Sequence, residues 1–202
     1  MKILPQMTKQ ENQQVHADVR VLREFVIECF RRVAISDAAS AIAADVLLES
    51  DLRGIESHGV ARLGEFYIGR IRNGDTNPAP TVRVVHEAPS TALLDGDGGM
   101  GIVVGHQAME LAIEKAEDHG IAAVGVRNSN HHGALAYWGM MAVDRGMICI
   151  ATTNAPAIMA PLGGVTETLG NNPVCYAMPA GSAYPIVLDM AVSTAARNKI
   201  RV

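Results

Sequence analysis

The chain has 202 residues, of which 49% are hydrophobic and 19% are charged, and its formal net charge is −4 at pH 7. This composition predicts a folded protein with a substantial core and excludes a largely disordered chain. Because 21 acidic residues outnumber 17 basic ones and no dense basic run occurs, we expect neither nucleic acid nor an anionic membrane surface as a partner.

Cysteine usage and the N-terminus bear on the compartment. The three cysteines, Cys29, Cys149 and Cys175, are far apart, odd in number and without metal-ligand spacing, which favours reduced thiols over a disulfide framework. The N-terminus carries no signal-peptide pattern, and no membrane-length apolar run is free of Gly, Pro or charge. We therefore expect a cytoplasmic protein with no membrane partner.

Helical patterns dominate residues 1–78, which we expect to form an N-terminal helical region. Apolar residues recur at helical spacing from 15 to 33. An alanine-rich stretch over 38–52 follows Ser36, whose hydroxyl is a predicted N-cap, and Gly54 is the predicted stop.

A third predicted helix carries the reactive side chains of this region. It runs from Ser57, its predicted N-cap, to Gly74. His58 then lies in the first turn, where the helix dipole disfavours a protonated ring, and Arg62 lies one turn further on the same side. A neutral imidazole beside a fixed cation suits proton transfer to a carboxylate-bearing substrate. The alternative is that Ser57 only caps the helix, His58 is a half-buried polar residue and Arg62 is solvated.

Strands and helices alternate over residues 79–202, which predicts a layered α/β domain. In chain order we expect strands or a hairpin over 82–85 and 91–94, a helix over 101–119, a strand over 121–126, a helix over 134–145, a buried strand over 147–152, an apolar stretch over 174–178, a strand over 185–190 and a helix from 191.

A glycine-rich run between the second strand and the next helix, Gly96 to Gly101, matches the spacing G-x-G-x-x-G. In a Rossmann fold an acidic residue should follow about 20 residues later at a strand end. Position 121 is Ile, and the following strand runs out into Arg127 and Asn128. We therefore interpret the run as a turn that needs glycine and expect a fold that is not of the Rossmann type.

Polar side chains from Arg127 to Gly133 follow the apolar strand over 121–126, where open α/β sheets place their ligands. His131 and His132 leave three alternatives open. They could bind a metal, belong to a loop ordered by Asn and Ser, or contact a substrate or cofactor. Adjacent histidines rarely reach one ion, and no Cys or carboxylate lies at ligand spacing, so we expect no metal.

Asp189 follows an otherwise apolar strand, so its carboxylate needs a partner. One possibility is an imidazole, whose tautomer an aspartate would fix in an acid/base pair. The other is the N-terminus of the helix predicted from Ala191.

Several motifs in order resemble the malate/L-lactate dehydrogenase family. They are Asp51 to Arg62, Asn128 to His131 with Gly133-Ala134, the loop 154–164, Gly170 to Pro173, and Asp189 to Ala191. The resemblance implies the fold of that family and an NAD(P)-dependent hydride transfer. Its substrates would be a small 2-oxo acid or cyclic imino acid and the matching 2-hydroxy or amino acid.

The resemblance also implies roles for individual residues. His58 matches the proton-donating histidine, and His131 matches a second active-site histidine that is the acid/base in some members. Ser57, Arg62 and Asn154 match substrate contacts, and Asp189 is a further catalytic residue that could pair with His58. The implied cofactor-binding residues are Gly170, Asn171, Asn172, Pro173, Asp189, Met190 and Ala191.

Two departures accompany the resemblance. Asn171 stands where the family usually has threonine, and family members continue past residue 202, so we expect the α/β domain to be incomplete at its C-terminus. We expect a homodimer that acts on a small molecule with NAD or NADP as cofactor. The alternative function is a catalytically inactive module that only binds or dimerises.

Overall fold

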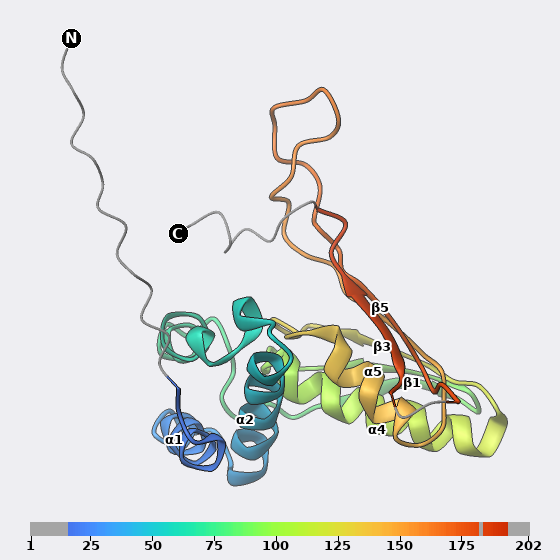
Figure 1. Cartoon of the computed structure of the whole chain (residues 1–202), viewed down its shortest axis with the longest axis horizontal. Coiled ribbons are helices and arrows are strands. Elements are labelled where there is room, and N and C mark those ends of the chain that lie inside the picture. The colour runs from blue at the N-terminus through green and yellow to red at the C-terminus, as the bar shows by residue number, and fades with distance from the viewer. Residues whose placement is uncertain (1–15, 182–183, 194–202) are drawn as a thin grey trace.

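Two capped helices open the part of the chain that the computed structural model describes, residues 16–181 and 184–193 (Figure 1). α1 (Val19–Arg31) follows Asp18, whose carboxylate accepts the N–H groups of Arg20 and Val21. α2 (Asp37–Leu52) follows Ser36, whose hydroxyl accepts the N–H of Ala39. The predicted cap and helix are thus confirmed for α2, whereas α1 begins at Val19 because Asp18 caps it there.

The predicted single helix from Ser57 to Gly74 is wrong. The chain instead forms two 3₁₀ turns, η1 (Glu56–His58) and η2 (Val60–Arg62), then a π-helix, η3 (Leu63–Ile68), and one turn of α-helix, α3 (Gly69–Arg72). Ser57 lies inside η1 and caps no helix.

The carboxylate of Asp51 explains this irregular path. It accepts the N–H of Val60 at 2.8 Å, and a Cβ on Gly59 would overlap it. Only glycine lets the backbone approach the carboxylate so closely, and the bond separates η1 from η2. A contact between residues nine apart in sequence therefore replaces a regular first helical turn.

The rest of the described chain contains two three-stranded sheets. In the first, β1 (Arg83–Ala88) and β2 (Thr91–Asp95) form an antiparallel hairpin, and β3 (Ala123–Arg127) lies parallel to β2. α4 (Gly101–His119) makes the crossover and ends at Gly120, whose φ of 78° lies in the left-handed region. The predicted hairpin and helix are confirmed.

The second sheet is antiparallel and consists of β4 (Cys149–Thr152), β5 (Val174–Met178) and β6 (Ile186–Met190). α5 (Leu135–Val143) packs on one face of it. The opposite face is exposed, with Ile150, Tyr176 and Leu188 side by side in one row of the register. The prediction that the strand over 147–152 is buried is therefore wrong, because β4 alternates between buried and exposed side chains. Most of the helix predicted from Ala191 lies outside the described residues.

One core joins the helical region to the α/β elements. It includes Phe30 of α1, Leu47 of α2, Ile102 of α4, Trp138 of α5 and Cys175 of β5, all nearly inaccessible to solvent. The core thus extends across the predicted boundary at 78/79, and that boundary stays a prediction. No helix among the described residues has the length and apolar character needed to span a membrane.

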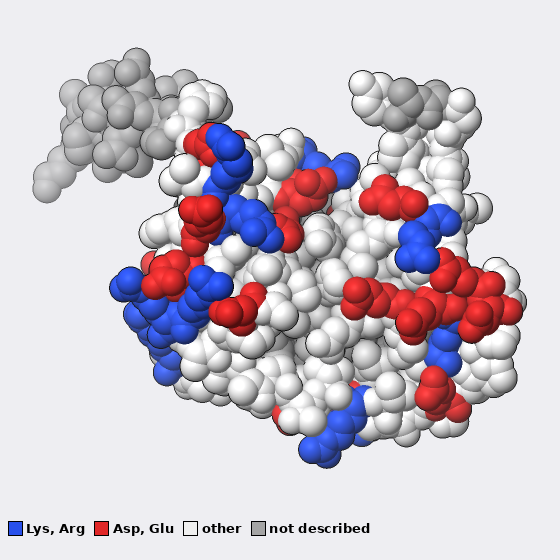
Figure 2. Space-filling model, turned by 90° about the horizontal axis from the view of Figure 1, so that it is seen from below, with Lys and Arg blue, Asp and Glu red and all other residues white. Residues whose placement is uncertain are grey.

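The charged surface is mixed. Basic and acidic side chains alternate around α1 and α2, and an acidic row marks the right-hand side of Figure 2. Many charges are paired. For example, Nε of Arg23 on α1 lies 2.5 Å from Oδ1 of Asp45 on α2. The view shows no extended basic surface.

Candidate active site

Two histidines from distant parts of the sequence meet in the structure. The rings of His58, on η1, and His131, in the loop after β3, stack with centroids 5.6 Å apart and planes 17° apart. In the described part of the chain, the hydrogen bonds of both rings involve Nδ1 and none involves Nε2. The Nε2 atoms are therefore the ring positions left for a bound molecule.

His58 is held through its other ring nitrogen. Its Nδ1 lies 3.0 Å from the hydroxyl of Ser57. Burial lowers the pKa of His58, and the positive charge of Arg62 lowers that pKa further. The ring is therefore neutral at pH 7, as expected from the sequence, but burial is the main cause instead of a helix dipole.

His131 is enclosed by aromatic side chains. The Oη of Tyr67 lies 2.7 Å from its Nδ1, and the ring of Phe66 meets it edge to face at 4.8 Å. Burial is the main cause that lowers the pKa of His131 to about 3, with additional contributions from the charges of His58 and nearby arginines.

Two arginines lie on the ring of Phe66 beside the histidines. The guanidinium carbons of Arg62 and Arg70 are 4.8 and 5.5 Å from the ring centroid. Arg62 donates from Nε to the carbonyl of Ser57 at 2.8 Å, and Arg70 donates to the side-chain oxygen of Asn130 at 2.9 Å. This positive surface suits an anionic ligand, because guanidinium groups bind carboxylates through paired donors.

The glycine-rich run, Gly96 to Gly101, holds the loop that carries His131. The amide of Asn130 donates to the carbonyl of Gly98 at 2.7 Å, and the N–H of Gly98 donates to the carbonyl of Asn128 at 2.8 Å. A Cβ at Gly101 would overlap the backbone carbonyl of Asn130. These glycines form a tight turn and also allow close packing of two backbones, which the sequence pattern alone does not distinguish.

Asp189 does not pair with His58, so this part of the sequence interpretation is wrong. Its carboxylate accepts the N–H of Ala136 at 2.8 Å and also bonds the N–H of Leu135. Asp189 therefore caps the N-terminus of α5 from the neighbouring strand β6. The helix predicted from Ala191 lies mostly outside the described residues, so the expected capping of that helix stays a prediction. Burial raises the pKa of this carboxyl group, while the backbone hydrogen bonds act in the opposite direction.

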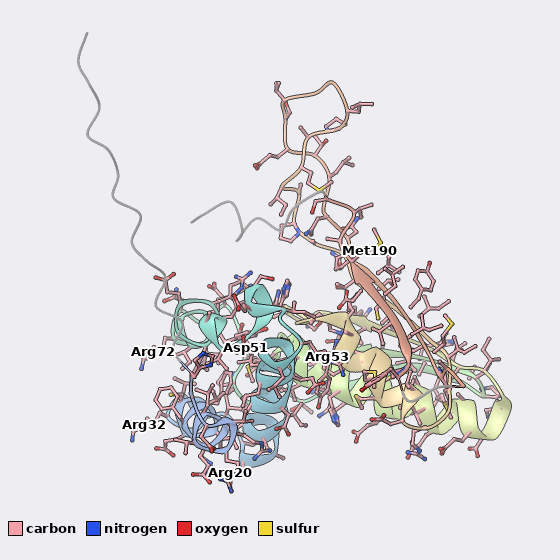
Figure 3. All side chains as sticks on the ribbon, viewed as in Figure 1. Arg20, Arg32, Asp51, Arg53, Arg72 and Met190 are labelled. Atoms are coloured by element: carbon pink, nitrogen blue, oxygen red, sulfur yellow. The ribbon has the colours of Figure 1, made fainter. Side chains whose placement is uncertain are left out.

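The structure brings the two predicted cofactor segments together. β5 and β6 pair Val174 with Met190, and the N–H of Val192 donates to the carbonyl of Asn171. Residues 170–173 and 189–191 are thus neighbours at the end of β6 marked by Met190 in Figure 3. Asn172 and Met190 are exposed there.

Asn154 lies two positions after the end of β4. It is exposed near the base of the long loop between β4 and β5, which projects from the body in Figure 1. Within that loop the amide oxygen of Asn172 accepts the N–H of Ala155 at 2.9 Å. The expected contact of Asn154 with a substrate stays a prediction.

The ring of His132 has different neighbours from the ring of His131. Its ring packs against Trp138, with centroids 5.2 Å apart, and lies where a side chain on Gly105 would be. Burial lowers the pKa of His132 to about 4. No group of three or more metal-ligating side chains occurs among the described residues.

Sequence reasoning missed Phe66, Tyr67 and Arg70, and it included Asn130 only as part of the motif from Asn128 to His131. Tyr67 fitted the apolar spacing of the predicted helix, which concealed the role of its hydroxyl. Phe66 and Arg70 carried no local pattern. Their roles depend on contacts between η3 or α3 and a loop more than 55 positions away in the sequence.

Comparison with known proteins agrees with this fold and identifies a family. A family model described as malate/L-lactate dehydrogenase matches residues 17–202. Malate dehydrogenase of Pyrococcus abyssi is 46% identical over 90% of this chain and 49% of its own length. L-sulfolactate dehydrogenase of Methanocaldococcus jannaschii is 41% identical over 88% of this chain and 51% of its own length.

A solved structure of malate dehydrogenase from Pyrococcus horikoshii OT3 is similar as well. It has a TM-score of 0.89 and 42% identity, and the match covers 93% of this chain and 53% of that one. The fold is therefore that of α/β dehydrogenases of this type. The chain belongs to the malate/L-lactate dehydrogenase family, and it spans about half the length of the relatives it matches.

Proposed function

We propose that this chain carries the proton-transfer and carboxylate-binding part of an NAD(P)-dependent oxidoreductase for small 2-hydroxy and 2-oxo acids. The observation that carries the proposal is the stacked pair of neutral histidines beside Arg62. Family membership and the names of the relatives, malate and L-sulfolactate dehydrogenases, support the same reaction class.

His58 acts as the acid/base in this proposal. With Nδ1–H donating to Ser57, the lone pair on Nε2 accepts the hydroxyl proton when a 2-hydroxy acid is oxidised. In the reverse reaction the protonated ring returns that proton to the 2-oxo acid. The low pKa that burial and Arg62 give His58 keeps the ring ready to accept a proton at pH 7.

Arg62 binds the substrate carboxylate, and Arg70 adds a second positive charge on the same aromatic ring. Malate and sulfolactate each carry two acidic groups, so two guanidinium groups suit such substrates. The bond from Arg62 to the carbonyl of Ser57 fixes the guanidinium next to His58.

The cofactor is a nicotinamide dinucleotide, NAD or NADP, which accepts or supplies the hydride. The residues that would hold it are Gly170 to Pro173 and Asp189 to Ala191. Their fit rests on their proximity and on the exposed, uncharged side chains of Asn172 and Met190. Asp189 serves this segment indirectly, because its carboxylate ties β6 to α5. We further propose that the protein is a homodimer, as the family resemblance implies, and that it is cytoplasmic, as its cysteine usage favours.

The test is oxidation of NADH or NADPH in the presence of a panel of 2-oxo acids, followed by absorbance. We expect turnover with at least one acid in the parent chain and a fall of roughly 100-fold or more for His58→Asn. His86→Asn is the matched control, because His86 is exposed on β1. Unchanged turnover of His58→Asn would exclude the assigned role.

Calorimetric titration with NADH and NADPH addresses the catalytically inactive alternative. Tight binding of one cofactor together with turnover supports the enzyme. Binding of a 2-oxo acid without any turnover in the parent chain would support the binding module instead.

A further inference from the structure

We propose that Tyr67 is a positioning residue that holds His131 in the tautomer with the proton on Nε2. His131 then serves as a hydrogen-bond donor to the substrate oxygen and not as a second base. The inference rests on the proposed function, because it assigns different roles to His58 and His131 in that reaction.

The tautomer follows from the partners of Nδ1. The backbone N–H of Gly133 points at this atom at 3.3 Å, and a backbone N–H can only donate. In this geometry Nδ1 of His131 presents its lone pair, and the hydroxyl of Tyr67, 2.7 Å away, is the closer donor to it, whereas the longer bond from Gly133 is too weak to hold the tautomer alone. A neutral imidazole that accepts at Nδ1 carries its proton on Nε2.

Tyr67 is suited to this role by its own surroundings. Its side chain is only 4% exposed, and its ring packs edge to face on Phe30 and Phe66 at 6.3 and 5.3 Å. Burial raises the pKa of Tyr67, so the hydroxyl keeps the proton that it donates. The π-helix η3 places Phe66 and Tyr67 against His131 from two directions, a distortion of helical geometry that is frequent at functional sites.

The arrangement gives the two histidines opposite functions. Nδ1 of His58 faces a hydroxyl group that can accept or donate, so this ring can exchange its proton. Nδ1 of His131 faces, besides the hydroxyl of Tyr67, the backbone N–H of Gly133, which can only donate, and this leaves Nε2–H as its available group. One ring can therefore bind the oxygen of the substrate while the other transfers the proton.

Nuclear magnetic resonance of the ¹⁵N-histidine-labelled chain at pH 7 tests the inference directly. The spectrum of His131→Asn identifies the signals of His131. We expect the parent to show an unprotonated Nδ1 and a protonated Nε2, and Tyr67→Phe to show averaged or inverted tautomers. Tyr137→Phe is the control, because Tyr137 packs near His106 and not against His131.

Two results would overturn the inference: a protonated Nδ1 in the parent, or the same Nε2–H tautomer in Tyr67→Phe. The parent spectrum decides the tautomer even where the variant does not fold. A kinetic measurement then follows, in which Tyr67→Phe lowers kcat/KM by roughly 2- to 10-fold, the effect of one lost hydrogen bond. If the tautomer is found but the parent has no turnover, the proposed function fails and the tautomer assignment stands.

Discussion

Lowering the pH from 7 to 5 should destabilise the fold through His132, whose Nδ1 is buried without a hydrogen-bond partner among the described residues. Burial lowers the pKa of this ring from 6.5 to about 4 in the folded state. The unfolded chain therefore binds a proton between these pH values that the folded chain does not. The stability contributed by the neutral ring is complete above pH 6.5 and is lost as the pH falls toward 4.

The size of the effect follows from this shift. Each pH unit within the window changes the free energy of unfolding by about 1.4 kcal/mol, so the step from pH 7 to pH 5 costs about 2 kcal/mol. Protonation of His131 in the unfolded chain should lower the free energy of unfolding by a similar amount over the same step, since the pKa of His131 in the folded state is about 3. A variant that removes only His132 keeps that second contribution.

Urea unfolding of the parent and His132→Gln at pH 7, 6 and 5 isolates the effect, because glutamine does not titrate. We expect the difference in unfolding free energy between the two proteins to shift by about 2 kcal/mol in favour of the variant on going to pH 5. His86→Gln, on the exposed strand β1, should run parallel to the parent. Parallel curves for His132→Gln as well would refute the reasoning.

Three further predictions concern the site and its supports. Gly59→Ala should lower the free energy of unfolding by about 1–3 kcal/mol, because the new Cβ displaces the Asp51 carboxylate and leaves the N–H of Val60 unpaired. In thermal unfolding, the loss of stability in the double variant Gly59→Ala/Asp51→Ala should be smaller than the sum of the losses in the two single variants. Asp189→Ala should lower the free energy of unfolding by about 1 kcal/mol, because it removes the cap of α5. Asp189→Asn keeps an oxygen that can accept the same hydrogen bond, so it should retain most of the stability and most of the turnover. Arg62→Lys should raise the KM for a 2-oxo acid roughly 10-fold or more with a smaller change in kcat, and equal KM values would contradict carboxylate binding.

Elements with local signals were predictable from the sequence. Ser36 caps the N-terminus of α2 and Gly120 caps the C-terminus of α4, and both could be predicted because cap preferences depend on residues adjacent in sequence. The strands or hairpin expected over 82–85 and 91–94 and the helix expected over 101–119 also followed from turn residues and periodicity, whereas the parallel pairing of β2 with β3 was not predicted.

The irregular segment after α2 could not be predicted in the same way. Apolar spacing from Val60 to Ile71 fits a regular helix, but the carboxylate of Asp51 bonds the N–H of Val60 across nine residues. The spacing carries no information on this bond, so the 3₁₀ turns and the π-helix replace the expected first turns.

The site itself was only partly predictable. His58 and His131 each carried a separate signal, but their stacking depends on how the loop after β3 packs against η3. The predicted pairing of Asp189 with His58 was wrong for a related reason. The register of β6 places the Asp189 carboxylate next to the start of α5 and not next to an imidazole. Contacts between strands and helices distant in sequence decide both outcomes.

The most direct test of the proposed reaction is the rate at which the parent chain and His58→Asn oxidise NADH or NADPH with 2-oxo acids such as those related to malate and sulfolactate. The stacked histidines and Arg62 predict turnover in the parent and a loss of roughly 100-fold or more in the variant, with His86→Asn unchanged. Equal rates for His58→Asn and the parent would contradict the assignment of His58 as the acid/base.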